Sequence, residues 1–248
     1  MKTFLSRLAR RYVSKSIRRT IVRYTRWPVV GWVRFGSLRR LRPISPEWGF
    51  ERGLPLDRYY IEHFLQAHAF DLRGHGLEIK EDLYSTRFGG DRITRVDILH
   101  PEAGNPKATI VADLTRAGHL ASDTFDFIIC TQTLHLIYDV RAVVATLYRI
   151  LRPGGILLTT VSGISKISRD DMDRWGHNWC FTTRSAEQLF HEFFPANNVR
   201  VEAHGNVLTA MAFLHGLSTR DLRQKELDYE DEDFQVLITI RAVKPEQT

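Results

Sequence analysis

The apolar and polar positions of residues 125–161 form one strand–helix–strand pattern. Residues 125–130 are nearly all apolar, which is typical of a strand buried on both faces of a parallel sheet. Asp139 can cap a helix whose apolar positions from Val140 onward share one face. Pro153 and the two glycines after it cannot continue that helix. Residues 156–161 then return to the sheet, so the segment predicts a right-handed crossover unit.

The same alternation extends to both sides of this unit. Further strands are expected at residues 74–79, 92–97, 108–113, 199–203 and 235–243, and further helices at residues 57–65, 185–194 and 207–217. Strand follows helix almost throughout, which predicts an α/β fold with a doubly wound, mostly parallel sheet and helices on both faces. Such sheets bind ligands beyond the carboxyl ends of their strands. Here that edge includes the polar residues 131–135.

Residues 125–155 resemble class I S-adenosylmethionine-dependent methyltransferases. The resemblance lies in Phe125-Asp126 with its apolar run, in the polar cluster that ends at Leu134-His135, and in the Leu-Arg-Pro-Gly-Gly turn at residues 151–155. In that family these segments belong to the fourth and fifth strands of a seven-stranded sheet. The resemblance covers roughly residue 57 to the C-terminus and implies S-adenosylmethionine as the cofactor. Another doubly wound domain with a Pro-Gly-Gly turn is the alternative.

Acidic residues follow or lie in three successive predicted strands. A carboxylate that closes the second strand can accept both vicinal hydroxyls of a ribose, and we expect Asp97, next to Ile98, in that role. The resemblance implies that Asp113 accepts from the adenine amino group, with the Leu114 backbone beside it, and that Glu78 organises the loop after the first strand. An acid at a strand end is often only a cap, but three in register favour a nucleoside site.

The loop at residues 80–90 departs from the family. Its members carry a Gly-x-Gly-x-Gly turn after the first strand, whereas this loop has no glycine before Gly89. Close backbone approach to a cofactor is therefore not expected, and Arg58, Tyr59 and Tyr84 are expected to hold the cofactor's carboxylate and amine instead. A methyltransferase-like protein that binds the cofactor weakly or not at all is the alternative. The loop also argues against a dinucleotide site.

His135 is the first candidate for a catalytic base. Methyl transfer to oxygen or nitrogen requires aligned reactants and the removal of a proton, and histidine titrates near physiological pH. His135 follows the fourth strand, where a base can reach an acceptor, although a lining or packing role is the alternative. Thr131 and Gln132 precede it and are expected to line the cofactor pocket.

Residues 162–182 are the expected loop on the acceptor side. His177 in this loop is a second candidate base, and Trp175 and Trp179 flank it. Aromatic faces suit sugars or flat molecules, so a small-molecule or glycan acceptor is expected. A structural aromatic cluster is the alternative for the tryptophans.

Charge divides the chain into a basic arm, residues 1–45, and a methyltransferase domain, residues 46–248. Thirteen Lys and Arg and no acid precede Glu47, so the rest of the chain carries 35 − 13 = 22 basic against 29 acidic side chains, a net −7. The arm's apolar residues recur at loosely helical spacing at Phe4, Leu5, Leu8, Tyr12, Ile17 and Ile21. Such an arm can bind an anionic membrane surface or an acidic partner, resembles a transit peptide, or is a solvated extension.

No apolar run approaches the roughly 20 residues of a membrane-spanning helix, and Cys130 and Cys180 suit neither a disulfide framework nor a zinc site. We therefore expect no metal and a cytoplasmic location, with peripheral membrane association as a further option. The expected activity is methyl transfer to oxygen or nitrogen of a small molecule or glycan. A non-catalytic scaffold and a nucleic-acid methyltransferase are the alternatives. The acidic body makes nucleic acid the less favoured partner.

Overall fold

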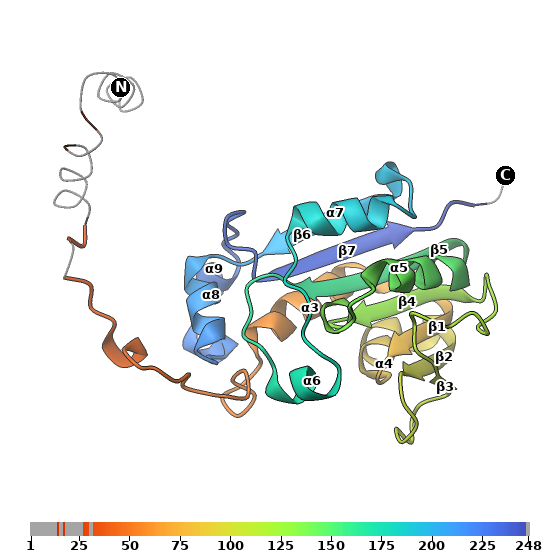
Figure 1. Ribbon diagram of the computed structural model, residues 1–248, viewed down its shortest axis with the longest axis horizontal. Helices are drawn as coiled ribbons and strands as arrows, with labels where there is room; N and C mark the ends of the chain where they lie inside the picture. The colour runs from red at the N-terminus through yellow and green to blue at the C-terminus, as the bar shows by residue number, and fades with distance from the viewer. Residues whose placement is uncertain (1–13, 15–16, 18–26, 30–31, 247–248) are drawn as a thin grey trace. The chain divides into compact units, whose positions relative to one another are not determined.

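The computed structural model describes residue 14, residue 17, residues 27–29 and residues 32–246. The chain divides into two units, residues 1–41 and residues 42–248, and both are drawn in Figure 1. The sequence placed this boundary after residue 45. Apart from Ile17, the expected amphipathic helix of the arm lies outside the described residues.

The described part of the first unit contains one short 3-10 helix, η1 (Gly36–Leu38). Six large apolar side chains in the described part of this unit are exposed, namely Ile17, Trp27, Trp32, Val33, Phe35 and Leu41. Over the described parts of the chain, no helix is both long enough and apolar enough to cross a membrane.

The second unit is built on a seven-stranded sheet with the order β3-β2-β1-β4-β5-β7-β6. The strands are β1 (Gly74–Ile79), β2 (Ile93–His100), β3 (Ile110–Val111), β4 (Phe125–Thr131), β5 (Leu151–Ser162), β6 (Val199–His204) and β7 (Leu237–Val243). The first five strands pair in parallel, and β7 runs antiparallel to β5 and β6. The expected doubly wound, mostly parallel sheet is confirmed.

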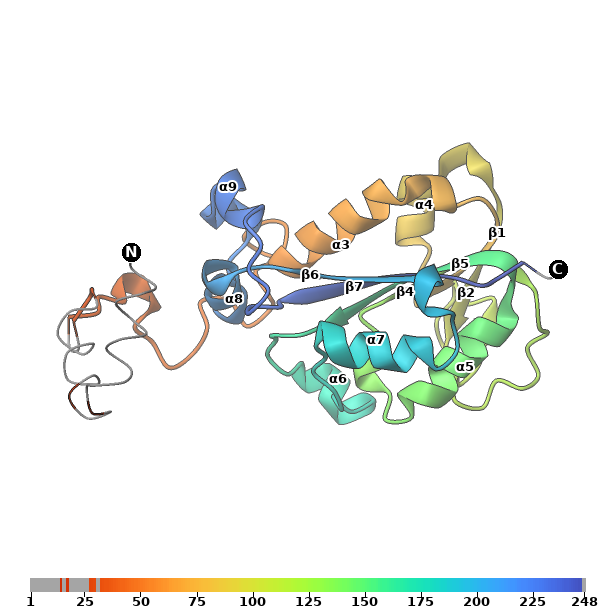
Figure 2. The same cartoon turned by 90° about the horizontal axis from the view of Figure 1, so that it is seen from above.

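Helices cover both faces of the sheet (Figure 2). One face carries α3 (Leu56–Ala67) and α4 (Leu83–Gly89), and the other carries α5 (Val140–Ile150), α6 (Arg169–Arg174) and α7 (Thr183–His191). Two more helices, α8 (Val207–Leu214) and α9 (Gln224–Leu227), precede β7. Leu227 of α9 and the apolar side chains of α8 that face inward join the core that lies under α3.

Strand β4 shows why this sequence needs two covering layers. Phe127 and Ile129 belong to the core shared with α3, α4 and α8, whereas Ile128 and Cys130 belong to the core shared with α5 and α7. All four side chains are completely buried. Burying each large apolar side chain contributes about 1.5–3 kcal/mol, so neither face of β4 can be left to water.

Helix α5 follows its predicted pattern closely. Asp139 caps it by accepting from the Ala142 amide at 3.0 Å, and the apolar face, which includes Val143 and Leu147, is buried. The Pro-Gly-Gly turn does not precede the next strand as expected. It lies inside β5, where the pairing with β4 shifts register between Leu151 and Ile156.

Further segments differ from the sequence-based prediction. Strand β3, expected at residues 108–113, is limited to Ile110–Val111. Strand β2 continues beyond residue 97 to His100, since its pairing with β1 and β3 extends through Ile98 and Leu99. The expected loop at residues 80–90 contains α4, and the expected acceptor loop contains α6. Both are short helices that depend on side-chain caps and tertiary contacts more than on their own apolar period.

The close contact between Gly76 of β1 and Phe127 of β4 allows a test of packing at the centre of the sheet. An ideal Cβ on Gly76 would lie 1.9 Å from the ring of Phe127. We expect Gly76→Ala to lower the free energy of unfolding in urea by about 2–3 kcal/mol, because the ring must leave its position. Gly118, whose added Cβ would meet no atom within 4 Å, supplies the control. Gly118→Ala should change stability by less than about 0.5 kcal/mol. Equal midpoints for the two variants would show that the core accommodates the methyl group.

Candidate functional site

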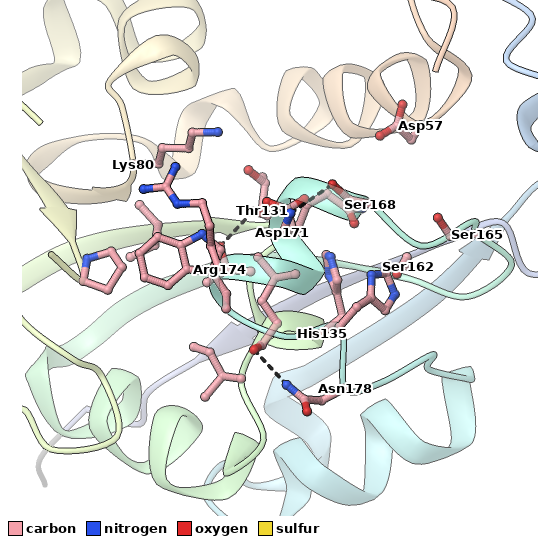
Figure 3. Close-up of a pocket in the computed structure, with 18 of the residues that line it drawn as sticks. Asp57, Lys80, Thr131, His135, Ser162, Ser165, Ser168, Asp171, Arg174 and Asn178 are labelled. Carbon is pink, nitrogen blue, oxygen red and sulfur yellow. Dashed lines mark hydrogen bonds between the residues drawn. The ribbon is translucent and has the colours of Figure 1, made fainter. Parts of the chain in front are cut away.

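A cavity of about 900 Å³ opens at the carboxyl ends of the parallel strands (Figure 3). Its walls come from the ends of β1, β2, β4 and β5, from the N-terminus of α3, and from the loop that contains α6. The edge is therefore the one that the sequence pattern predicted.

Glu78 in β1 fixes the start of α4. It is buried, and its two oxygens accept from the backbone amides of Tyr84, at 3.0 Å, and Ser85, at 2.8 Å. Burial raises the pKa of this carboxyl group. Glu78 thus organises the segment after β1, as the resemblance implied, and it also lines the cavity.

Of the three residues expected to hold the amino-acid part of a cofactor, Arg58 and Tyr84 line the cavity. The Arg58 guanidinium donates to the Tyr84 hydroxyl, which joins α3 to α4. The prediction for Tyr59 is wrong, because its hydroxyl donates to Asp228 and accepts from Gln224 outside the cavity. Tyr59 is buried and belongs to the core under α3, so its ring is turned away from the cavity that Arg58 lines.

The predictions for Asp97 and Ile98 are also wrong, since neither residue lines the cavity. Asp97 lies within β2 rather than at its end, and its oxygens accept from Arg95 at 2.9 Å and the Thr109 hydroxyl at 2.8 Å. It also lies 2.7 Å from the His75 ring. The true end of β2 brings His100 and Glu102 to the cavity. The apolar pair after Asp97 was the signal that the strand continues.

Strand β3 ends at Val111, so Asp113 lies two residues beyond the strand instead of closing it. Asp113 and Leu114 nevertheless both line the cavity. The Oδ1 atom of Asp113 accepts from the Thr115 amide at 2.9 Å and from its hydroxyl at 2.8 Å. This local turn holds the carboxylate at the cavity wall.

The segment after β4 supplies Thr131, Gln132 and His135, and all three line the cavity. The backbone of Gln132 has φ +48°, a value that is uncommon for residues other than glycine. Its Nε2 atom and the His135 Nδ1 atom are buried without a hydrogen-bond partner among the described residues. Burial lowers the pKa of His135 to about 4.

His177 is brought onto His135 by backbone bonds between two distant segments. The His135 carbonyl accepts from the amides of Asn178, at 2.8 Å, and Trp179, at 3.2 Å. The Asn178 side chain donates to the Leu136 carbonyl at 2.9 Å, the bond drawn in Figure 3. The two imidazole rings are consequently 4.8 Å apart. Both predicted bases therefore share one wall.

The two tryptophans of the acceptor-side loop have different positions. Trp175 lines the cavity, with its ring edge-on to that of His100. Trp179 does not line it, and its indole nitrogen donates to the carbonyls of Ile137 and Tyr138. Trp179 thus holds the loop in place, so for this tryptophan the structure agrees with the structural role that the sequence analysis gave as the alternative to acceptor binding.

Sequence reasoning missed Asp57 and Lys80. Asp57, in the first turn of α3, is one of the residues that line the cavity (Figure 3), and its Oδ1 atom is buried without a partner in the described part of the chain. Burial raises its pKa. Lys80 lines the cavity with φ +79°. An acid just after Pro55 looked like a helix cap in the sequence, and Lys80 looked like an ordinary loop residue.

Residues 74–159 match the family described as a methyltransferase domain. No curated protein matches the chain by sequence. Similar solved structures include a candidate sarcosine dimethylglycine methyltransferase from Galdieria sulphuraria, at 13% identity over 77% of this chain and 88% of that chain, with a TM-score of 0.51. A SAM dependent methyltransferase from Archaeoglobus fulgidus is 9% identical over 75% of this chain and 94% of that chain, with a TM-score of 0.50.

Phosphoethanolamine N-methyltransferase 2 of Haemonchus contortus is similar as well, at 11% identity over 77% of this chain, with a TM-score of 0.48. The alignment spans 57% of that longer protein. At these identities the likeness to solved structures is one of fold. The family match over residues 74–159 and the strand order of the sheet support the resemblance of this chain to the class I S-adenosylmethionine-dependent methyltransferases.

Proposed function

We propose that the protein transfers a methyl group from S-adenosylmethionine to an oxygen or nitrogen of a small molecule or glycan. The observation that carries this proposal is the pair of facing histidines, His135 and His177, with ring centres 4.8 Å apart. Each has an Nδ1 atom that is buried without a partner among the described residues. Such atoms are costly unless a ligand completes their hydrogen bonds.

The residues of the cavity fit the cofactor. Asp113 and Leu114 would hold the adenine, and Glu102 at the end of β2 would accept from the ribose hydroxyls in place of Asp97. Arg58 and Tyr84 would hold the amino-acid part, while the unpartnered amide of Gln132 and the hydroxyl of Thr131 offer further polar contacts. When bound, S-adenosylmethionine supplies an electrophilic methyl group on a sulfonium.

His135 would accept the proton that the acceptor loses. Its lowered pKa keeps the ring neutral at physiological pH, so a ring nitrogen has a lone pair available. Burial lowers the pKa of His177 as well. The alternative, in which His135 only lines the cofactor pocket, leaves His177 as the base.

Aromatic and hydroxyl side chains support a sugar or a flat molecule as the acceptor. Trp48, Phe50 and Trp175 contribute aromatic faces to the cavity wall, and Ser162 contributes a buried hydroxyl without a partner among the described residues. Aromatic faces bind apolar sugar or ring surfaces, while hydroxyl groups exchange hydrogen bonds with polyols.

Transfer of a labelled methyl group tests this proposal. Full-length protein with [methyl-³H]S-adenosylmethionine should label members of a panel of sugars, phenols and amines. His135→Ala should lower that rate by about 10²–10⁴-fold if the ring is the base. His119→Ala, which removes an exposed histidine outside the cavity, should leave the rate unchanged. Binding of S-adenosylhomocysteine without transfer to any acceptor class would instead favour a non-catalytic binding protein.

The protonation state of His135 predicts a pH dependence of stability. The unfolded chain takes up this proton near pH 6.5, whereas the folded protein takes it up only near pH 4. Because the unfolded state binds the proton first, stability falls as the pH is lowered between these values. From this residue alone we expect a loss of about 2 kcal/mol between about pH 7 and about pH 5. Urea unfolding of His135→Gln should show a smaller loss, and the same slope in both proteins would contradict the buried neutral ring.

We further propose that the basic arm associates with anionic membrane surfaces, which would place the protein peripherally on a membrane. Thirteen basic residues without an acid precede Glu47. Among the described residues of this arm, Trp27, Trp32 and Phe35 are exposed. Exposed aromatic side chains between basic residues favour the interface of an anionic bilayer.

Charge removal tests this association. Arg39→Gln with Arg40→Gln removes two exposed charges, each worth about 1 kcal/mol at an anionic surface, so binding to vesicles with phosphatidylserine should weaken about tenfold or more. Arg116→Gln with Arg184→Gln removes two exposed charges from the second unit and should have little effect. Cosedimentation that changes with neither substitution nor salt would exclude an electrostatic role for the arm.

A further inference from the structure

The turn after β1 has the backbone of a glycine but the side chain of a lysine. Lys80 follows the last residue of β1 with φ +79°, a conformation that glycine adopts without strain and that costs other residues about 1–2 kcal/mol. Its Cβ and side chain occupy space that glycine would leave open, and Lys80 lines the cavity. A ligand therefore cannot approach this turn as closely as it could approach a glycine.

The polar groups around this turn are also engaged within the protein. The Lys80 amide donates to the Leu99 carbonyl at 2.8 Å, and the Lys80 carbonyl accepts from the Asn105 side chain at 2.7 Å. The amides of Tyr84 and Ser85 both donate to Glu78. These four groups are not available to a ligand, so an amino-acid group bound here must find other partners.

The first turn of α3 offers such partners in Asp57 and Arg58. Both line the cavity, and the Oδ1 atom of Asp57 is buried without a hydrogen bond in the described part of the chain. Arg58 donates to the Tyr84 hydroxyl. Among the described residues, no carboxylate lies within ion-pair distance of Arg58. Asp57 and Arg58 are thus an acidic and a basic residue at the same part of the cavity wall. The Asp57 carboxylate can accept further hydrogen bonds, and the Arg58 guanidinium can donate further ones.

We propose that Asp57 and Arg58 bind the ammonium and carboxylate groups of the cofactor's methionine moiety and replace the backbone contacts of a glycine-rich turn. A zwitterion is the complement of adjacent opposite charges, and charge-assisted hydrogen bonds are the stronger kind. The bound ammonium supplies the donor that Asp57 Oδ1 lacks. This inference rests on the proposed function, because it concerns the same cofactor.

Three ligands that differ only in the amino-acid part test the assignment. S-adenosylhomocysteine carries both charged groups, S-adenosyl-3-thiopropylamine lacks the carboxylate, and 5′-methylthioadenosine lacks both. Calorimetric titration of the full-length protein should show affinities that decrease in that order, by about tenfold for each group lost.

Two substitutions separate the two contacts. Asp57→Asn should weaken S-adenosylhomocysteine and the thiopropylamine about tenfold and leave methylthioadenosine unchanged. Arg58→Met should weaken S-adenosylhomocysteine alone. Glu62→Gln is the control, since Glu62 lies on the same helix, pairs with Arg87 and does not line the cavity. It should change none of the three affinities.

Several results would overturn the inference. Unchanged binding of S-adenosylhomocysteine by Asp57→Asn would exclude Asp57 as its ammonium partner. An equal loss for all three ligands would show a structural effect, because a recognition residue acts only on the group that it contacts. Should a variant fail to fold, equal affinity of the parent protein for S-adenosylhomocysteine and methylthioadenosine would be decisive by itself. If the parent binds none of the three ligands, the proposed function fails as well, and that outcome is distinct from the others.

Discussion

Strand β4 has no polar face, and the arrangement of the second unit follows from that constraint. Its alternating side chains need an apolar layer on each side, so α3 and α8 must lie over one face while α5 and α7 lie over the other. Parallel strands cannot be joined by tight turns, so the helices that cover them also connect them. Polar side chains can be exposed to a ligand at the carboxyl end of β4, where the covering layers stop. Thr131, Gln132 and His135 lie at that end and line the cavity. The position of the cavity is thus a consequence of how the core is covered.

The sequence predicted the fold well where apolar periodicity decides the structure. The buried strand at residues 125–130 and the helix capped by Asp139 are confirmed. It was wrong where tertiary contacts decide. The end of β2 depends on pairing of Leu99 with Ile79 and Ile110 in the neighbouring strands, and the apolar pair after Asp97 was its local signal. Helix α4 has only seven residues and is anchored by the buried carboxylate of Glu78 rather than by its own propensity.

The residues of the candidate site, like the elements of the fold, could be predicted only where local sequence patterns determine their position. His135 and Asp113 follow strands, so the rule that ligands bind at the carboxyl edge was enough to place them at the cavity. Asp97 failed because an error in the end of a strand moves a side chain away from that edge. Asp57 was missed because the feature that distinguishes it is a buried oxygen without a hydrogen-bond partner among the described residues. That feature depends on the three-dimensional structure and not on the sequence pattern. His135 and His177 were separate candidates in the sequence, and the bonds to the His135 carbonyl that bring the two rings together could not be foreseen.

Those bonds have a consequence for how the protein can diversify. The loop that carries His177 is tied to the segment that carries His135 through the amides of Asn178 and Trp179 and the side chain of Asn178. A change in the length of this loop would also displace the His135 imidazole at the cavity wall. The shape of this part of the cavity wall and the position of His135 therefore change together in this chain. Single substitutions at side chains such as Trp175, which line the cavity without tethering the loop's backbone to that segment, are the evolutionary route that leaves the chemistry intact.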